Sequence, residues 1–206
     1  MDQQSINSGT DDRRTAIRSD MRKRRASLSA ESLTRAEQLL AKNIAALVEE
    51  LPGSPRHAAG YLAINGEIPL GHSFDVLRGY DILTSVPVIV DDTMRFAPLT
   101  ETTTLQKGKY GILIPEFIES ELIDATSLDI VLVPLVAFDA KGNRLGMGGG
   151  YYDRTFAELN TGKSRSQKKQ LFIGVGHEFQ KSDTVPAEHW DVPLHMAVTD
   201  QHTYRF

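Results

Sequence analysis

The sequence predicts an α/β protein, a three-layer α/β/α sandwich around a mainly parallel sheet. Apolar runs of strand length alternate with segments of helical periodicity along the 206 residues. This alternation is the pattern of parallel strands joined by helices. The most apolar run, residues 128–138 (LDIVLVPLVAF), is too short to cross a membrane and suits a central buried strand.

Two helices are expected at the start of the chain. Residues 1–12 are polar, so we expect a disordered leader followed by a single α/β domain over residues 13–206. From Arg13 the pattern becomes helical and basic. Ser29 is a candidate N-cap of the second helix, because apolar residues recur behind it at a 3.6-residue period until the Pro-Gly turn that follows Leu51.

Most of the expected strands lie between the second helix and the chain end. Each is a short apolar run closed by turn residues, as at Asn65-Gly66. We expect a helix over residues 71–79, a helix over 151–159, and a loop over 107–115. The expected strands cover residues 57–64, 81–90, 93–98, 128–138 and 171–176, with a last short strand at 195–198.

Composition excludes several classes of function. The chain has no cysteine, which excludes a disulfide framework, a thiolate nucleophile and a Cys-based zinc site. The net charge of -4 gives no overall preference for nucleic acid. No apolar run approaches the roughly 18 residues that span a bilayer, and the first residues lack the apolar core of a signal peptide. We therefore expect a cytoplasmic protein.

A glycine-rich segment follows the central strand and leads into the helix at 151–159. In the string FDAKGNRLGMGGGYYDR, residues 138–154, four glycines fall within five positions. Glycine lets the backbone approach an anion, and the first N–H groups of a helix attract phosphate. Arg144 can bind phosphate through two hydrogen bonds, and Asp153 can cap the helix or ligate Mg²⁺. The alternative is a tight turn that merely requires glycine.

The first helix carries three regularly spaced arginines. Arg14, Arg18 and Arg22 recur every four residues and so share one helix face. Such a run usually forms a solvated basic face or a patch for nucleic acid. We expect Lys23, Arg24 and Arg25 to be solvated.

The glycine-rich string resembles the signature of the 5-formyltetrahydrofolate cyclo-ligases, also called methenyltetrahydrofolate synthetases. The resemblance extends to residues 61–67 (YLAINGE), 109–115 and 191–194 (DVPL). It implies a fold related to the ribose-phosphate isomerase and CoA-transferase group, with ATP as co-substrate and Mg²⁺ as cofactor. The implied reaction is the ATP-dependent cyclisation of 5-formyltetrahydrofolate to 5,10-methenyltetrahydrofolate.

The resemblance also implies site residues. Arg144, Asp153 and Tyr151 are expected to be catalytic, and Asp153 and Asp191 to hold the metal. Arg14 stands where relatives often have Lys, and Met147 and Gly149 stand where some relatives have basic residues. The residues expected to bind ATP are Arg14, Arg18, Arg144, Leu145, Gly146, Met147, Gly148, Gly149, Gly150, Tyr152 and Asp153.

The resemblance places the pterin beside a carboxylate and an aromatic ring. Glu67 is expected to accept hydrogen bonds from the pterin edge, and Tyr151 to pack near the ring. Leu62, Met94 and Tyr110 are candidate walls, with plain core or loop packing as the alternative. Trp190 is expected to serve packing only. The basic loop 163–169 is either solvated or attracts the glutamate tail of a polyglutamylated folate.

The expected partners are ATP and 5-formyltetrahydrofolate, without nucleic acid or membrane, and we expect a monomer. One rival function is a sugar-phosphate isomerase or CoA transferase that uses the glycine turn without hydrolysing ATP. Another is a non-catalytic nucleotide- or RNA-binding module based on the arginine-rich helix, whose binding would fall steeply with salt.

Overall fold

The computed structural model describes residues 3–108, 113–160 and 170–206. Its long helices are α1 (Gln3–Ala26), α2 (Ala30–Glu50), α3 (Gly71–Gly79) and α4 (Tyr151–Asn160). Ser29 caps α2 as predicted, because its side chain accepts a hydrogen bond from the Ser32 N–H. Helix α1 begins at Gln3 and not at Arg13, so the helical conformation extends into the segment expected to be a leader.

A seven-stranded sheet forms the centre of the molecule, in the order β11-β10-β9-β6-β1-β2-β3. The four inner pairings are parallel, whereas the outer pairs β2–β3 and β10–β11 are antiparallel. The mainly parallel α/β architecture is therefore confirmed. The strands are β1 (His57–Ala59), β2 (Leu83–Val90), β3 (Thr93–Pro98), β6 (Ile130–Pro134), β9 (Leu171–Val175), β10 (Met196–Val198) and β11 (Thr203–Arg205).

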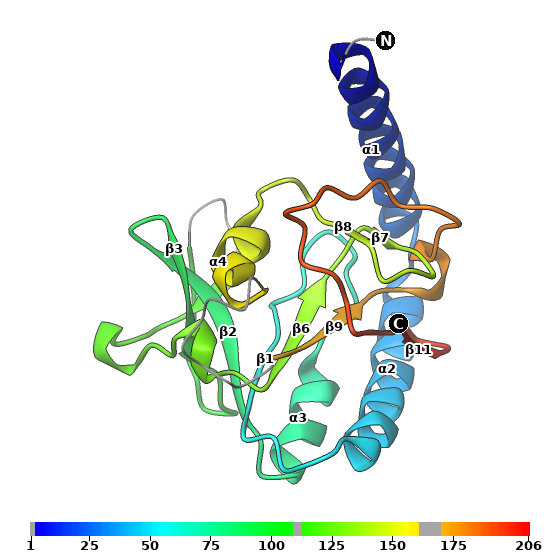
Figure 1. Cartoon of the computed structure of the whole chain (residues 1–206). Coiled ribbons are helices and arrows are strands. Elements are labelled where there is room, and N and C mark those ends of the chain that lie inside the picture. Colours follow the sequence, from blue (N-terminus) through cyan, green and yellow to red (C-terminus); the bar gives the residue numbers. More distant parts are fainter. Residues whose placement is uncertain (1–2, 109–112, 161–169) are drawn as a thin grey trace.

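Both faces of the sheet are covered, as the side-chain alternation of β6 shows. Ile130 and Leu132 pack in one core with apolar residues of α2 and α3. Val131 and Val133 point to the opposite face, where they pack with Phe156 of α4. Helices thus lie on the two faces of one sheet, which makes three layers. Helix α1 extends beyond this body (Figure 1).

The long apolar run 128–138 is two strands and not one. After β6 the chain leaves the sheet, and β7 (Ala137–Phe138) pairs with β8 (Arg144–Leu145) in a separate hairpin. The buried side chain of Gln180 donates to the carbonyls of Leu135 and Val136 at 2.7 and 2.9 Å. The side-chain amide of Gln180, distant in sequence, therefore replaces the hydrogen bonds that a neighbouring strand would make to Leu135 and Val136. The apolar character of residues 128–138 gives no sign of this partner.

Three other sequence-based predictions need correction. The strand expected over residues 57–64 ends at Ala59. Part of the expected loop 107–115 forms a hairpin of β4 (Leu105–Lys107) and β5 (Leu113–Pro115). Strand β11 was not predicted, and it pairs with β10 at the sheet edge.

Within the described residues, no helix has the length and apolarity that crossing a membrane requires. That residues 13–206 form one catalytic domain stays a prediction.

Candidate active site

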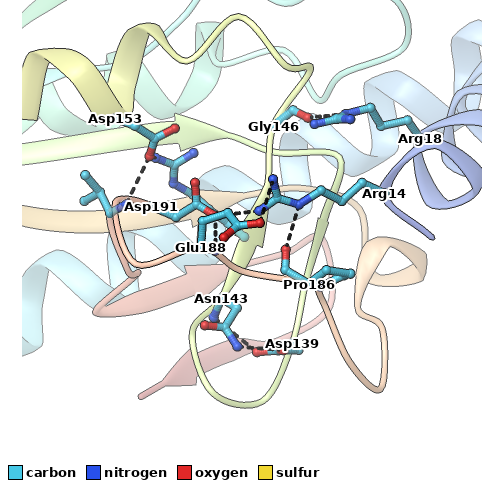
Figure 2. Close-up of polar contacts among 11 residues, drawn as sticks. Arg14, Arg18, Asp139, Asn143, Gly146, Asp153, Pro186, Glu188 and Asp191 are labelled. Atoms are coloured by element: carbon cyan, nitrogen blue, oxygen red, sulfur yellow. Dashed lines mark hydrogen bonds and ion pairs between the residues drawn. The ribbon is translucent and has the colours of Figure 1, made fainter. Parts of the chain in front are cut away.

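A cavity of about 410 Å³ lies where β6 ends and the glycine-rich turn begins. In open parallel sheets the carboxyl ends of the strands form the usual ligand crevice. The turn between β8 and α4 lines this cavity together with Arg14 and Arg18, which extend from α1 (Figure 2). The other lining residues are Glu67, Pro134, Leu135, Arg144, Leu145, Gly146, Met147, Gly148, Gly149, Gly150, Tyr151, Tyr152, Asp153, Arg154, Trp190 and Asp191.

The glycine turn adopts backbone conformations that other residues rarely accept. Gly148 and Gly150 have φ angles of +102° and +65°. A Cβ on Gly150 would lie 2.7 Å from Nη1 of Arg154, whereas one on Gly148 would meet only Arg18, at 3.7 Å. At these two positions the turn requires glycine for its backbone conformation, as the sequence pattern suggested.

Arginines from two helices converge on this turn. Arg18 donates from Nε to the carbonyl of Gly146 at 2.9 Å (Figure 2), and Arg154 donates to the carbonyl of Gly149 at 2.9 Å. Burial, together with the like charge of Arg14, lowers the pKa of Arg18 from its ordinary value. An anionic ligand would relieve this repulsion. Arg154 is a cavity residue that the sequence reasoning missed.

Two carboxylates of the site are each bound by an arginine. Asp153 accepts from Arg144 at 2.5 Å, and Asp191 accepts from Arg14 at 2.9 Å (Figure 2). Oδ1 of Asp153 also accepts from the Val192 N–H at 3.0 Å, which ties α4 to the C-terminal segment. The four charged residues therefore form two ion pairs on the cavity wall.

The hairpin before the glycine turn is held by a buried aspartate that the sequence reasoning did not single out. Asp139 accepts from the backbone N–H groups of Lys141, Asn143 and Val185 and from the side-chain amide of Asn143. Burial acts to raise its pKa, but these hydrogen bonds prevail and lower it. The turn that delivers Arg144 is thereby fixed.

Glu67 lines the cavity from a loop after β1, and it is mostly buried. Its Oε2 accepts from the Ile64 N–H at 3.1 Å, and its Oε1 lies 3.5 Å from Nη1 of Arg25. Burial raises its pKa, against the opposing effects of these two partners. The prediction that Arg25 is solvated was wrong, since Arg25 is only 2% exposed.

The structure brings together only some of the residues expected to hold a pterin. Tyr151 lines the cavity with Glu67 and has the guanidinium of Arg154 at 4.9 Å from its ring centre. Leu62 packs against the α2–α3 side of the core, and Met94 is buried on the α4 side. Neither belongs to the described lining of the cavity. Tyr110 and the loop 163–169 lie outside the described residues.

Trp190 was expected to serve packing, and its position contradicts this. Its side chain is 56% exposed and lines the cavity beside Asp191. Its ring contacts His189 edge-on, with 4.5 Å between ring centres. Apart from being the single tryptophan of the sequence, Trp190 had no feature that marked it as a cavity residue.

The acidic residues can hold a cation only with help from a ligand. In the described part of the chain, no group of three or more acidic or histidine side chains is placed to bind a metal. The hydrogen bonds found for Asp153 and Asp191 use one oxygen of each carboxylate. Mg²⁺ commonly takes one or two carboxylates and completes its shell with phosphate oxygens and water. The donor set fits Mg²⁺ bound together with a phosphate ligand.

Comparisons with known proteins agree on one family. A model described as the 5-formyltetrahydrofolate cyclo-ligase family matches residues 10–200. The chain is 34% identical over 185 residues to the 5-formyltetrahydrofolate cyclo-ligase of Haemophilus influenzae, which covers 88% of this chain and 95% of the relative. The cyclo-ligase of Mycoplasma pneumoniae is 28% identical over 189 residues, covering 91% of this chain and 99% of the relative.

Two solved structures share the fold. The NMR structure of the Aquifex aeolicus 5,10-methenyltetrahydrofolate synthetase has a TM-score of 0.72 at 28% identity, covering 93% of this chain and 92% of the other. The 5,10-methenyltetrahydrofolate synthetase from Mycoplasma pneumoniae has a TM-score of 0.69 at 26% identity, covering 91% and 99%.

Proposed function

The chain belongs to the 5-formyltetrahydrofolate cyclo-ligase family, and from this membership we propose that it converts 5-formyltetrahydrofolate to 5,10-methenyltetrahydrofolate with hydrolysis of ATP to ADP and phosphate. One observation carries the ATP part of the proposal. A glycine turn with two positive φ angles and four arginines line the same cavity at the carboxyl end of β6. Backbone N–H groups and guanidinium groups are the donors that phosphates require.

The chemistry begins with a poor leaving group. The oxygen of the N5-formyl group attacks the γ-phosphorus of ATP and forms an O–P bond. The bond between the γ-phosphorus and the bridging oxygen of the β-phosphate breaks, which releases ADP. N10 then attacks the activated formyl carbon and loses its proton. The C–O bond breaks, inorganic phosphate leaves with the former formyl oxygen, and the five-membered ring is closed.

The protein's part in this reaction is to hold charge and position. We assign Arg14, Arg18 and Arg144 to the phosphates, with the N–H groups of the glycine turn. Each arginine already has its guanidinium oriented by a protein oxygen. Glu67 is the acceptor for the pterin N–H groups, and Tyr151 is the ring that packs near the pterin. Both line the same cavity as the arginines.

Asp153 and Asp191 are the residues that would hold Mg²⁺. When bound, the ion neutralises charge on the phosphate oxygens. Both carboxylates line the cavity and are oriented by Arg144 and Arg14, so their positions are set before a nucleotide enters.

The remaining proposals concern the setting of the enzyme. We propose a monomeric, cytoplasmic protein whose fold is related to the ribose-phosphate isomerase and CoA-transferase group. We also propose that the enzyme accepts 5-formyltetrahydrofolate with a polyglutamate tail.

A coupled assay tests the function. Purified protein is mixed with ATP, Mg²⁺ and 5-formyltetrahydrofolate, and ADP release and near-ultraviolet absorbance of the product are followed together. The proposal predicts that both signals appear in equal amounts and only with both substrates. ADP release without folate dependence, or neither signal, would refute it. A sugar-phosphate isomerase or CoA transferase would give neither.

A further inference from the structure

One charged residue in the basic run of α1 is buried. Arg25 is 2% exposed, whereas Arg22, Lys23 and Arg24 on the same helix are exposed. A buried guanidinium is costly unless it is paired. Its position therefore calls for a reason beyond the solubility of the helix.

Arg25 lies between the two segments that form the cavity. Its Nη1 is 3.5 Å from Oε1 of Glu67, and its Nη2 is 3.9 Å from Sδ of Met147 in the glycine turn. Gly66 packs directly on the backbone of Arg25, since a Cβ there would lie 2.8 Å from the Arg25 carbonyl oxygen. The φ angle of Gly66 is +75°. The loop that carries Glu67 is thus seated on the last turns of α1.

The same loop is held from its other side by a histidine. His177 donates from Nε2 to the carbonyl of Gly66 at 3.0 Å, and its ring stacks on Phe179 with 5.0 Å between centres. Burial lowers the pKa of His177, so the imidazole is neutral at neutral pH. Gly66, next to Glu67, is therefore contacted by both His177 and the backbone of Arg25.

We propose that Arg25 is a positioning residue for the cyclisation, which holds the Glu67 carboxylate aimed at the pterin edge. The inference rests on the proposed function and deepens it, because it names the group that prepares the folate site. Arg25 acts through Glu67 and is not itself assigned a contact with either substrate. Since α1 also carries Arg14 and Arg18, the helix aligns the nucleotide and folate sides of the cavity together.

The proposal predicts a change in pH dependence. Burial raises the pKa of Glu67, while the Ile64 N–H and Arg25 act to lower it. Removing Arg25 takes away one lowering influence, so the pKa rises further and the carboxylate is protonated at higher pH. Tyr61 and Tyr152 also interact with Glu67, but burial raises the pKa of both phenols, and they stay neutral in this range.

The test compares Arg25→Met, Arg25→Lys, Glu67→Gln and the double variant Arg25→Met/Glu67→Gln with the wild type. The matched control is Lys23→Gln, which removes one charge from the same helix turn at an exposed position. Readouts are kcat, the KM for each substrate, the pH profile of kcat/KM for the folate, and thermal unfolding. The melting curve verifies that each variant is folded when it is assayed.

Four results are expected. Arg25→Met raises the folate KM by about tenfold, as for loss of a contact to a charged group, and changes the ATP KM less than about twofold. The acid limb of its kcat/KM profile for the folate moves to higher pH by about one unit. Arg25→Lys keeps a positive charge and shows a smaller rise in the folate KM than Arg25→Met. In the Glu67→Gln background, Arg25→Met raises the folate KM by less than about a further twofold, because the carboxylate that Arg25 positions is already absent. Lys23→Gln behaves as the wild type.

Other results would overturn the inference. Equal losses from Arg25→Met in both backgrounds, or an acid limb that does not move, would show that Arg25 serves only the fold. An equal rise in the KM for ATP and the KM for folate would also show that Arg25 serves only the fold. A folded wild type without turnover would refute the proposed function itself, and the inference with it.

Discussion

At the scale of single residues, the site depends on carboxylates that are paired with arginines before any ligand binds. Asp153 keeps the nearly buried Arg144 in place, and Asp191 does the same for the partly buried Arg14. Both arginine side chains are largely buried, and a buried guanidinium needs an acceptor. Each aspartate therefore has a structural role in addition to its proposed metal role.

Asp153→Asn affects both roles, and stability and kinetics measure the two effects separately. We expect a loss of stability of about 1–3 kcal/mol, because Arg144 would keep a buried charge without its anionic partner. The KM for Mg-ATP should rise, with the folate KM less affected. Asp124→Asn is the control, since Asp124 is a 66% exposed partner of Arg95 and should change stability by less than about 1 kcal/mol. Unchanged ATP use by folded Asp153→Asn would contradict the metal assignment.

The positions of the cavity residues were easiest to predict where a motif or a regular spacing marked them. Arg144, the glycines and Asp153 belong to one contiguous string, so the sequence brought them together without knowledge of the fold. Arg154 ends the same string, but nothing in the sequence singled it out as a cavity residue. Arg25 contacts Glu67 and Met147 from α1, and Trp190 lines the cavity from a C-terminal loop. Arg25 in particular looks like its solvated neighbours in sequence, but in the fold Gly66, Glu67 and Met147 lie against it.

At the scale of elements, the β7–β8 hairpin and the glycine turn make one rigid unit. Asp139 fixes the hairpin, Arg144 on β8 binds Asp153 on α4, and the turn between them carries the positive φ angles. Rigid donors lose little freedom when a phosphate binds, so preorganisation favours affinity.

Gly150→Ala tests the turn. With φ at +65° and a Cβ 2.7 Å from Arg154, alanine should cost about 1–3 kcal/mol of stability and displace the nucleotide contacts. Gly79→Ala is the matched control, because a Cβ at this position in α3 meets no atom within 4 Å. We expect a raised ATP KM for the first variant and wild-type kinetics for the second. Equal kinetics in both variants would show that the turn conformation is not required.

Asp139 gives the hairpin a predicted response to acid. Its pKa is lowered in the folded protein, so its stabilising effect is present above the ordinary pKa of about 4 and is lost as the pH falls through the folded value. Thermal unfolding of the wild type between pH 7 and pH 3 should therefore show a drop in stability that is smaller in Asp139→Asn. Parallel curves for the two proteins would contradict this role.

The elements themselves were largely predictable. Helices α2, α3 and α4 follow from periodicity and from the Ser29 cap, and strands β2, β3 and β9 follow from short apolar runs. The boundary error at 128–138 arises because apolar residues continue past β6, while the carbonyls of Leu135 and Val136 accept hydrogen bonds from Gln180. Tertiary hydrogen bonds of this kind have no local signature. At 57–64 the apolar run ends in a local turn, in which the Ile64 N–H donates to the Glu67 carboxylate and the Glu67 N–H donates to the Ile64 carbonyl.

At the scale of the whole molecule, α1 joins the two ends of the chain at the site. Arg14 binds Asp191 and the carbonyl of Pro186, and Arg18 binds the glycine turn (Figure 2). Although α1 extends beyond the body in Figure 1, its middle part therefore closes the cavity. The helix face was predicted from the four-residue spacing of its arginines, but its docking partners were not.

Arg18→Gln tests this closing role. Loss of one charge-assisted phosphate contact should raise the ATP KM by about tenfold or more, with a smaller effect on folate. Arg13→Gln removes the same charge from an exposed position on the same helix and should change neither KM. An equal rise in both variants would point to a general attraction of anions, which added salt would abolish.

The central claim is that the cavity between α1 and the glycine turn binds the triphosphate of ATP. A crystal structure with a non-hydrolysable ATP analogue and Mg²⁺ tests it most directly. We expect phosphate oxygens within hydrogen-bonding distance of the N–H groups of residues 148–150 and of the guanidinium groups of Arg14, Arg18 and Arg144. A nucleotide bound elsewhere, with this cavity holding only solvent, would contradict it.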